Sequence, residues 1–326
     1  MNSKQISLSA LSDELAAVRT KKKEFLKRID RIVPWGEWIS IIKPFYYKGE
    51  RGNKPYDLEL MLRIYLLQNL YTLSDMATVA EVIDSRAFSE FCGVDSPNQV
   101  PDGDTLGRFR NLLAKNDIQE KLFSQVIQLL LERHLILKKG TIVDSTIIKA
   151  PSSTKNVKKE RDPDAHQVKK GNTWHFGYKA HIGVDKDTGL VHSLEVTGAN
   201  VHDVTEASKL LTGEEETVYG DSGYLGAANR EDAIVRNKNG KKIKYQINRR
   251  PSQIKKLSKS GYNAAKKKEH AKSSIRAKVE HVFGVVKGIF RYRKTRYRGL
   301  RKQTAKLHMM FALANLYLAD RPCLAV

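Results

Sequence analysis

The chain has 326 residues with 58 Lys and Arg against 36 Asp and Glu, so its formal net charge is +22. At roughly 150 residues per domain the length suggests about two domains, and so basic a protein is expected to bind a polyanion, either nucleic acid or an anionic membrane. Two cysteines without a close pair exclude a disulfide scaffold, a Cys-based zinc ribbon and an iron–sulfur site. No apolar run approaches the roughly 20 residues of a membrane span, and the first residues lack a signal-peptide core, so we expect a cytosolic protein.

Residues 1–136 are predicted to form an all-helical domain. Residues 11–31 are amphipathic, and the run LELMLRIYLLQNL has the apolar density of a buried helix. Further helices are expected up to residue 137, with these candidate N-caps: Ser74 or Asp75, Asp84 or Ser85, and Asp104. Short helices of this kind suit a module for DNA binding or dimerisation, although a purely structural bundle fits as well.

Residues 137–326 have an α/β pattern, which predicts a mixed sheet flanked by helices. KGTIVDSTIIKA predicts a strand, residues 151–172 a loop, and the turn at 187–189 a hairpin. TVYG predicts another strand. Helices are expected from a capping box at Asp203 through Leu211, over 226–236 and over 304–319.

Nearly all of the excess charge lies in residues 236–301, which hold 23 basic side chains and two acids, a net charge of +21. A disordered basic tail is one interpretation, and it suits the polar, turn-rich part that we treat as a basic insertion at about 236–270. It does not suit residues 272–290, where apolar side chains recur at helical spacing and predict a packed amphipathic helix.

Glu280 is one of the two acids in this basic segment. On a regular helix it lies within about 40° of Arg276 and Lys287. The simpler interpretation is an i,i+4 salt bridge from Arg276 to Glu280. The alternative is a metal ligand, because a segment that attracts phosphate retains few carboxylates and a bound metal reverses the repulsion between a carboxylate and DNA.

Two aspartates complete a candidate site. Asp144 interrupts an apolar strand, where a carboxylate is costly unless it is paired or binds metal. Asp221 follows a strand and precedes Ser222-Gly223, at a position where α/β proteins collect functional groups. Each could instead be structural, as a turn cap or the partner of an arginine. Three such carboxylates suit Mg²⁺ and a two-metal phosphodiester reaction.

Other polar residues have simpler explanations. His175, Lys179 and His181 share one face of a strand, where phosphate contact or packing is favoured over zinc binding because no third zinc ligand is evident. Asp203 is expected to be a helix cap. Ser145 and Ser222 have no partner arrangement typical of a nucleophile.

Four blocks in order resemble the catalytic blocks of bacterial DDE-type transposases of the insertion-sequence-five group. These blocks are GTIVDSTIIKAPSSTKN, KKGNTWHFGYKAHIGVD, YGDSGYLGA and SIRAKVEHVFGVVK. PYDLELMLRIYLLQNLYTLSD and PDGDTLGRFRNLL resemble that family's N-terminal domain, so the resemblance covers most of the chain. The wider group's R-x3-E-x6-K pattern is matched by Arg276, Glu280 and Lys287, but its preceding tyrosine is replaced by Ser273.

The resemblance implies a ribonuclease H-like catalytic fold over residues 137–326 and a catalytic, metal-binding triad of Asp144, Asp221 and Glu280. It implies Mg²⁺, with Mn²⁺ as a substitute, and water-driven cleavage followed by strand transfer. The implied partners are the terminal inverted repeats, target DNA and further copies of the chain in a synaptic complex at the bacterial nucleoid. Combined with the charge distribution, it gives these expected DNA contacts: Arg276, Lys287, Lys255, Lys256, Lys266, Lys267, Lys268, Arg291 and Arg293.

Two other functions remain open at this point. One is a ribonuclease H-like nuclease such as a junction resolvase, which would hydrolyse DNA without joining ends. The other is a catalytically inactive DNA-binding protein. The membrane alternative is weaker, because the positive charge surrounds the third carboxylate.

Overall fold

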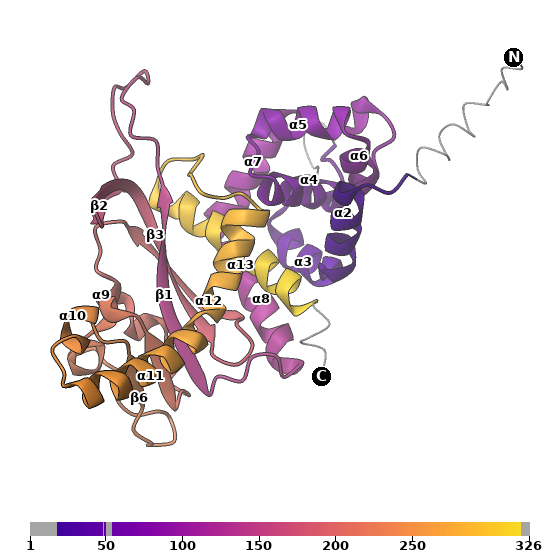
Figure 1. Ribbon diagram of the computed structural model, residues 1–326. Coiled ribbons are helices and arrows are strands. Elements are labelled where there is room, and N and C mark those ends of the chain that lie inside the picture. The colour runs from indigo at the N-terminus through magenta and orange to yellow at the C-terminus, as the bar shows by residue number, and fades with distance from the viewer. Residues whose placement is uncertain (1–17, 48, 50–53, 321–326) are drawn as a thin grey trace, which may run out of the picture.

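The computed structural model describes residues 18–47, 49 and 54–320, in which helices are followed by a sheet with helices packed on it (Figure 1). The first part contains α2 (Lys21–Ile32), α3 (Trp35–Ile42), α4 (Leu58–Leu70), α5 (Asp75–Asp84), α6 (Arg86–Cys92), α7 (Gly103–Lys115) and α8 (Ile118–Glu132). The predicted amphipathic stretch thus corresponds to α2, and its first residues lie outside the described part. Within these ranges no helix is both long enough and apolar enough to cross a bilayer.

The ends of these helices follow from their capping residues. The Ser74 side chain accepts a hydrogen bond from the Ala77 amide and starts α5, as predicted. The predicted cap at Asp104 is wrong by two residues, because Asp102 accepts from the Thr105 amide at 2.7 Å and starts α7. Asp104 lies in the first turn instead, where its charge still complements the helix dipole.

Within the described part of the chain, the sheet is mixed and has six strands. They are β1 (Gly140–Lys149), β2 (His166–Lys170), β3 (Thr173–Asp185), β4 (Val191–Gly198), β5 (Thr217–Gly220) and β6 (Lys244–Ile247). Strand β3 pairs antiparallel with β1, β2 and β4, whereas β5 runs parallel to β1 and β6 runs parallel to β5. This is the ribonuclease H-like arrangement of a mixed sheet with helices, preceded by a helical region.

One apolar core joins the two parts of the molecule. Helix α13 (Leu300–Ala319) lies between the sheet and the N-terminal helices and is buried nearly all round (Figure 1). It packs on α8 from one side and on β4 from the other. The Asn315 amide exchanges two hydrogen bonds with the backbone of Val191, at 2.9 and 2.7 Å, which fixes the helix on the strand. The helical region and the sheet therefore share a core that includes Leu122, Ile142 and Leu313.

Three local predictions in the α/β part are wrong. The loop expected over 151–172 ends in β2, which pairs with β3. The helix expected over 226–236 is only a short 3₁₀ turn, Ala227–Asn229. The single helix expected over 272–290 is divided: α11 (Lys259–Arg276) ends at Ala277, α12 (Lys278–Gly284) follows, and a π-helical turn occupies Val285–Ile289.

The basic insertion contains more regular structure than its composition suggests. Strand β6 extends the sheet, and α10 (Pro251–Ile254) leads into α11, whose N-cap Ser258 accepts from the Gly261 amide. These elements form the lower-left part of the molecule in Figure 1. The tail interpretation therefore fails for the described residues of the insertion.

Candidate active site

Asp144 lies near the middle of β1, and its side chain is 17% exposed. Burial raises the pKa of its carboxyl from 3.8 to about 6. The Ser145 amide, which donates to Oδ1 at 2.7 Å, and the Arg276 guanidinium lower this pKa. The negative charges of Asp221 and Glu280 raise it. These two acids therefore lie close enough to Asp144 to repel its ionised form.

Asp221 directly follows β5, the strand that pairs parallel with β1. Its Oδ1 accepts from the Gly223 amide at 2.7 Å, so the carboxylate caps the 3₁₀ turn Ser222–Tyr224. The structural explanation, a turn cap, therefore holds for this side chain, and its functional role stays a prediction. A parallel neighbour ending beside β1 brings Asp221 toward Asp144, although 77 positions separate them in the sequence.

Glu280 lies in the first turn of α12 and is exposed. Val279, Val282 and Phe283 bury the opposite side of this helix in the core. Helix α12 also contacts β1, so Glu280 is held on the sheet face that carries Asp144. Among the described residues, however, no three His, Cys, Asp or Glu side chains lie close enough together to hold a metal ion.

Arg276 pairs with Asp144 and not with Glu280. Its Nη2 lies 3.5 Å from Asp144 Oδ2, and its Nη1 donates to Asn248 Oδ1 at 3.1 Å. The expected i,i+4 salt bridge is absent from the described ion pairs because α11 ends between the two residues. Arg276 therefore supplies the positive charge that faces Asp144.

Lys287 lies in the π-helical turn and donates to the Ile147 carbonyl of β1 at 2.8 Å. The regular helical spacing used above does not apply through this turn, so Lys287 does not simply continue the face of Arg276 and Glu280. Burial is the main cause that lowers the pKa of Lys287, and the nearby cations Lys170 and Arg293 lower it further. Lys287 is thus part of a basic cluster beside the carboxylates.

Asp203 is not a helix cap, because α9 (Asp203–Glu206) begins with it and His202 is the N-cap. Its Oδ1 accepts from Ser145 Oγ at 2.8 Å and forms an ion pair with Lys179 Nζ at 3.0 Å. His181 Nδ1 lies 3.6 Å away, and burial lowers the pKa of this imidazole to about 4. Ser145 follows Asp144 in β1, so this network lies behind the strand that carries the candidate site.

Gly223 separates Asp203 from Asp221. A Cβ built on Gly223 would lie 2.9 Å from Asp221 Oδ1 and 3.8 Å from Asp203 Oδ2. Only glycine leaves the Asp221 carboxylate in place at this distance. Asp203 therefore borders the candidate site as a fourth carboxylate. Sequence reasoning missed this position of Asp203. The available hint was that Ser145, which binds Asp203, follows Asp144 directly, but this hint is useful only once the pairing of β1 with β3 is known.

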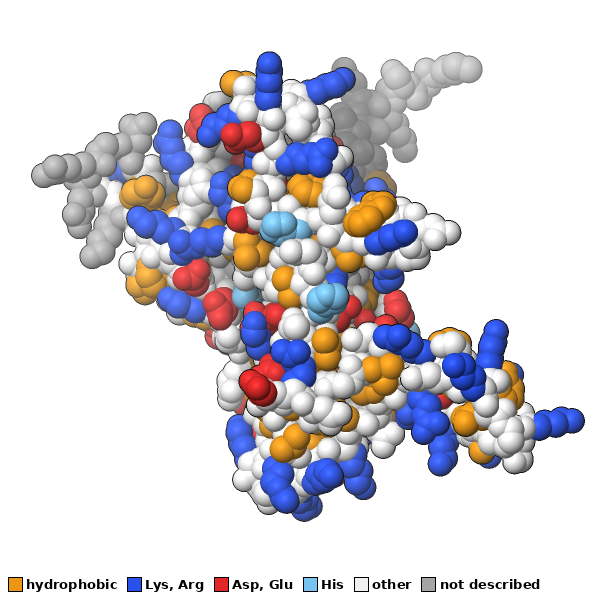
Figure 2. Space-filling view, turned by 90° about the vertical axis from the view of Figure 1, so that its left-hand side faces the viewer, with side chains coloured by type: hydrophobic (Ala, Val, Ile, Leu, Met, Phe, Trp, Pro, Cys, Tyr) orange, Lys and Arg blue, Asp and Glu red, His pale blue; other side chains and the backbone are white. Residues whose placement is uncertain are grey.

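The lysines of the basic insertion that were expected to meet DNA are exposed. Lys255 and Lys256 follow α10, and the 266–268 run lies on α11. Arg291 and Arg293 follow the π-helical turn and are also exposed. In Figure 2, Lys and Arg side chains gather over the lower part of this face, where α10 and α11 lie, and over its top, with acidic side chains between them.

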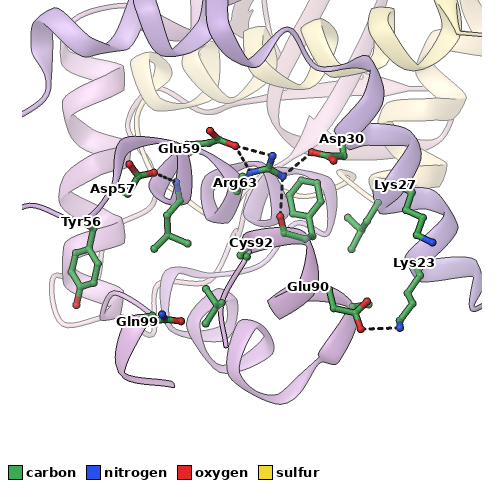
Figure 3. Close-up of a pocket in the computed structure, with 16 residues that line it drawn as sticks. Lys23, Lys27, Asp30, Tyr56, Asp57, Glu59, Arg63, Glu90, Cys92 and Gln99 are labelled. Atoms are coloured by element: carbon green, nitrogen blue, oxygen red, sulfur yellow. Dashed lines mark hydrogen bonds and ion pairs between the residues drawn. The ribbon is translucent and has the colours of Figure 1, made fainter. Parts of the chain in front are cut away.

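A cavity of about 740 Å³ lies among α2, α4 and α6, away from the candidate carboxylates (Figure 3). Its charged side chains are largely paired with one another: Arg63 binds Asp30 and Glu59, and Lys23 binds Glu90. None of the predicted site residues lines it. We therefore assign no part of the chemistry to this cavity.

The helical region followed by a mixed sheet with helices defines a ribonuclease H-like fold. A family model described as Transposase DDE domain matches residues 136–316, and one described as Transposase domain (DUF772) matches residues 13–112. The first match covers more than half of the chain, so the chain belongs to the transposase DDE domain family. No solved structure was found to match it.

Proposed function

We propose that the chain is the transposase of a bacterial insertion sequence of the insertion-sequence-five group, acting at the nucleoid. In this proposal Asp144, Asp221 and Glu280 are the catalytic carboxylates. The main support is that Asp144 is desolvated and also repelled by the other two acids, although they come from separate elements. Such a carboxylate is stabilised by a cation, and a phosphodiester reaction requires one at the reacting phosphate.

The donor set suits Mg²⁺, with Mn²⁺ as a substitute, because all three groups offer hard carboxylate oxygens. When bound, the metal would activate the attacking oxygen and stabilise the leaving one. The three acids do not yet form a close group, so we expect the carboxylates to converge when metal and DNA bind. Arg276, which now faces Asp144, is positioned to transfer its contact to a DNA phosphate.

The remaining cations support DNA binding in the proposal. Lys287 lies near Glu280, and Arg293 donates to the Lys287 carbonyl. Arg291 is exposed near Tyr71, and the lysines of 255–268 extend away along α10 and α11. Residues 1–136 would bind the terminal inverted repeats or dimerise, and residues 137–326 would catalyse. Two ends must meet for strand transfer, so we expect a homo-oligomeric synaptic complex.

The test is incubation of the full chain with Mg²⁺ and duplex DNA taken from the sequences that flank the gene. We expect strand cleavage at the repeat end and joining of the freed 3′-hydroxyl to a second duplex. Hydrolysis without joining would favour a resolvase-like nuclease, and tight binding with no metal-dependent chemistry would favour an inactive DNA-binding protein. Folded Asp144→Asn, Asp221→Asn and Glu280→Gln variants that retain activity would refute the triad.

A further inference from the structure

The hairpin of β2 and β3 carries an exposed tryptophan whose role the proposed carboxylate site does not explain. Trp174 is 63% exposed, near the start of β3, and Lys169 stands opposite it in β2. An indole at the surface beside cations offers a flat face on which a planar ligand can stack. Beyond the residues that pair with β1, this part of β3 pairs with β2, so the indole lies on a two-stranded hairpin.

A hollow of about 380 Å³ lies beside this indole. Trp174 and Phe176 supply aromatic surface, and Lys149 and Arg161 supply positive charge. The Arg161 guanidinium lies 5.7 Å from the centre of the Phe176 ring. Gln167 supplies an amide that can read the edge of a base.

His175 also borders the hollow, but side chains alternate along β3, so its imidazole lies on the opposite face from Trp174 and Phe176. Aromatic surface, cations and hydrogen-bonding groups around one hollow are the combination by which proteins hold single nucleotides.

The hollow is connected to the carboxylate site. Side chains alternate along a strand, so Trp174 and Phe176 lie on the same face of β3 as Ile182, which pairs with Asp144. Lys287 donates to the Ile147 carbonyl of β1 and is near enough to Lys149 and Lys170 for their charges to lower its pKa, so cations lie between Glu280 and the hairpin. The eight residues from Ile182 to Trp174 span about 27 Å at roughly 3.4 Å per residue, which equals about eight nucleotides of B-DNA along one strand.

We propose that the hollow beside Trp174 is a DNA subsite that receives one unstacked base about eight nucleotides from the cut phosphate, with the indole stacking on the base and Lys149 and Arg161 binding the phosphates beside it. This inference rests on the proposed function, because it takes DNA at the carboxylates as its origin. A fully paired helix offers no single base to a hollow of this size, so the expected occupant is a base unpaired or flipped from the duplex.

The first experiment measures binding of a short single-stranded oligonucleotide, without metal, by the full chain and three variants. Trp174→Ala should weaken binding by about 10-fold, whereas Trp174→Phe should stay within about 3-fold because it retains a stacking surface. Ile83→Ala removes an exposed side chain on α5, away from the hairpin, and should bind like the wild type. Equal affinity of Trp174→Ala and wild type would overturn the proposal.

The second experiment places a fluorescent base analogue at successive positions of a duplex end that carries one unpaired nucleotide. Stacking on Trp174 should quench the analogue most strongly about eight nucleotides from the cut, and Trp174→Ala should abolish that maximum. A flat quenching profile in the wild type would refute the subsite. A quenching maximum without Mg²⁺-dependent cleavage by the wild type would refute the proposed function and leave the subsite in place. Normal cleavage with a flat profile would refute the subsite alone.

Discussion

Asp144 and Asp203 both lie beside β1, and their surroundings differ. Asp203 has a near-complete set of partners, with Lys179 at 3.0 Å and Ser145 Oγ at 2.8 Å. Asp144 is more buried, has one longer contact to Arg276, and is repelled by two other acids. A carboxylate with satisfied charge stabilises the fold, whereas one left short of cations is positioned to bind one.

The strongest contrast is expected in catalysis. Asp144→Asn should lower DNA cleavage by on the order of 10³-fold or more, because metal ligation contributes several kcal/mol to the transition state. Asp203→Asn keeps the hydrogen bonds and the shape of the network, so it should lower cleavage by only about 10-fold. Single-turnover cleavage of a labelled duplex checks both. Equal losses would mean that Asp203 belongs to the reacting group.

For the free energy of unfolding, we expect the loss of the Asp203 carboxylate to be destabilising. Asp203→Ala leaves Lys179, whose side chain is 9% exposed, buried without its carboxylate and should cost about 3 kcal/mol of unfolding free energy. Removing both charges with Lys179→Met and Asp203→Ala should recover part of this loss. Urea unfolding measures each variant. Glu216→Ala, in a largely exposed pair with Lys241, is the control and should change stability by less than about 1 kcal/mol.

Without metal, Asp144 should make stability depend on pH. Its folded pKa of about 6 lies above the ordinary 3.8, so the folded protein binds this proton more tightly than the unfolded chain. The stabilising contribution is therefore complete below pH 3.8 and is lost as pH rises through 6. Asp144→Asn should thus gain on the order of 2–3 kcal/mol over the wild type above about pH 6 in a chelator. A gain that does not vary with pH would show that Asp144 is not desolvated.

The smallest effect per residue, an effect on DNA affinity, is expected from the exposed lysines of the basic insertion. Replacing Lys255, Lys256, Lys266, Lys267 and Lys268 by Ala should flatten the plot of log K against log salt, by about 0.9 for each phosphate that is no longer neutralised. DNA-binding titrations over a range of salt measure the slope. Lys302→Ala, an exposed lysine on α13, is the control. An unchanged slope in the fivefold variant would mean that these lysines do not meet phosphate.

Much of the fold could be predicted because local chemistry decides it. Ser74 starts α5, the β-branched run at 140–149 forms β1, and the hairpin turn at 187–189 joins β3 to β4. The predictions that failed concern segments whose secondary structure depends on contacts with distant parts of the chain. Strand β6 forms within a basic, turn-rich segment because β5 offers it a parallel edge. The helix through Glu280 divides at Ala277 and widens at 285–289, so its regular spacing could not locate Lys287.

The sequence by itself identified three acids in distinctive contexts as candidates and located a +21 segment around one of them. Both follow from composition and from local pattern, which need no knowledge of distant neighbours. Only the tertiary structure decided how those groups are paired. Arg276 lies on Asp144, and Asp203 lies behind it with Lys179, because strand pairing joins residues far apart in the chain and sets which face each occupies.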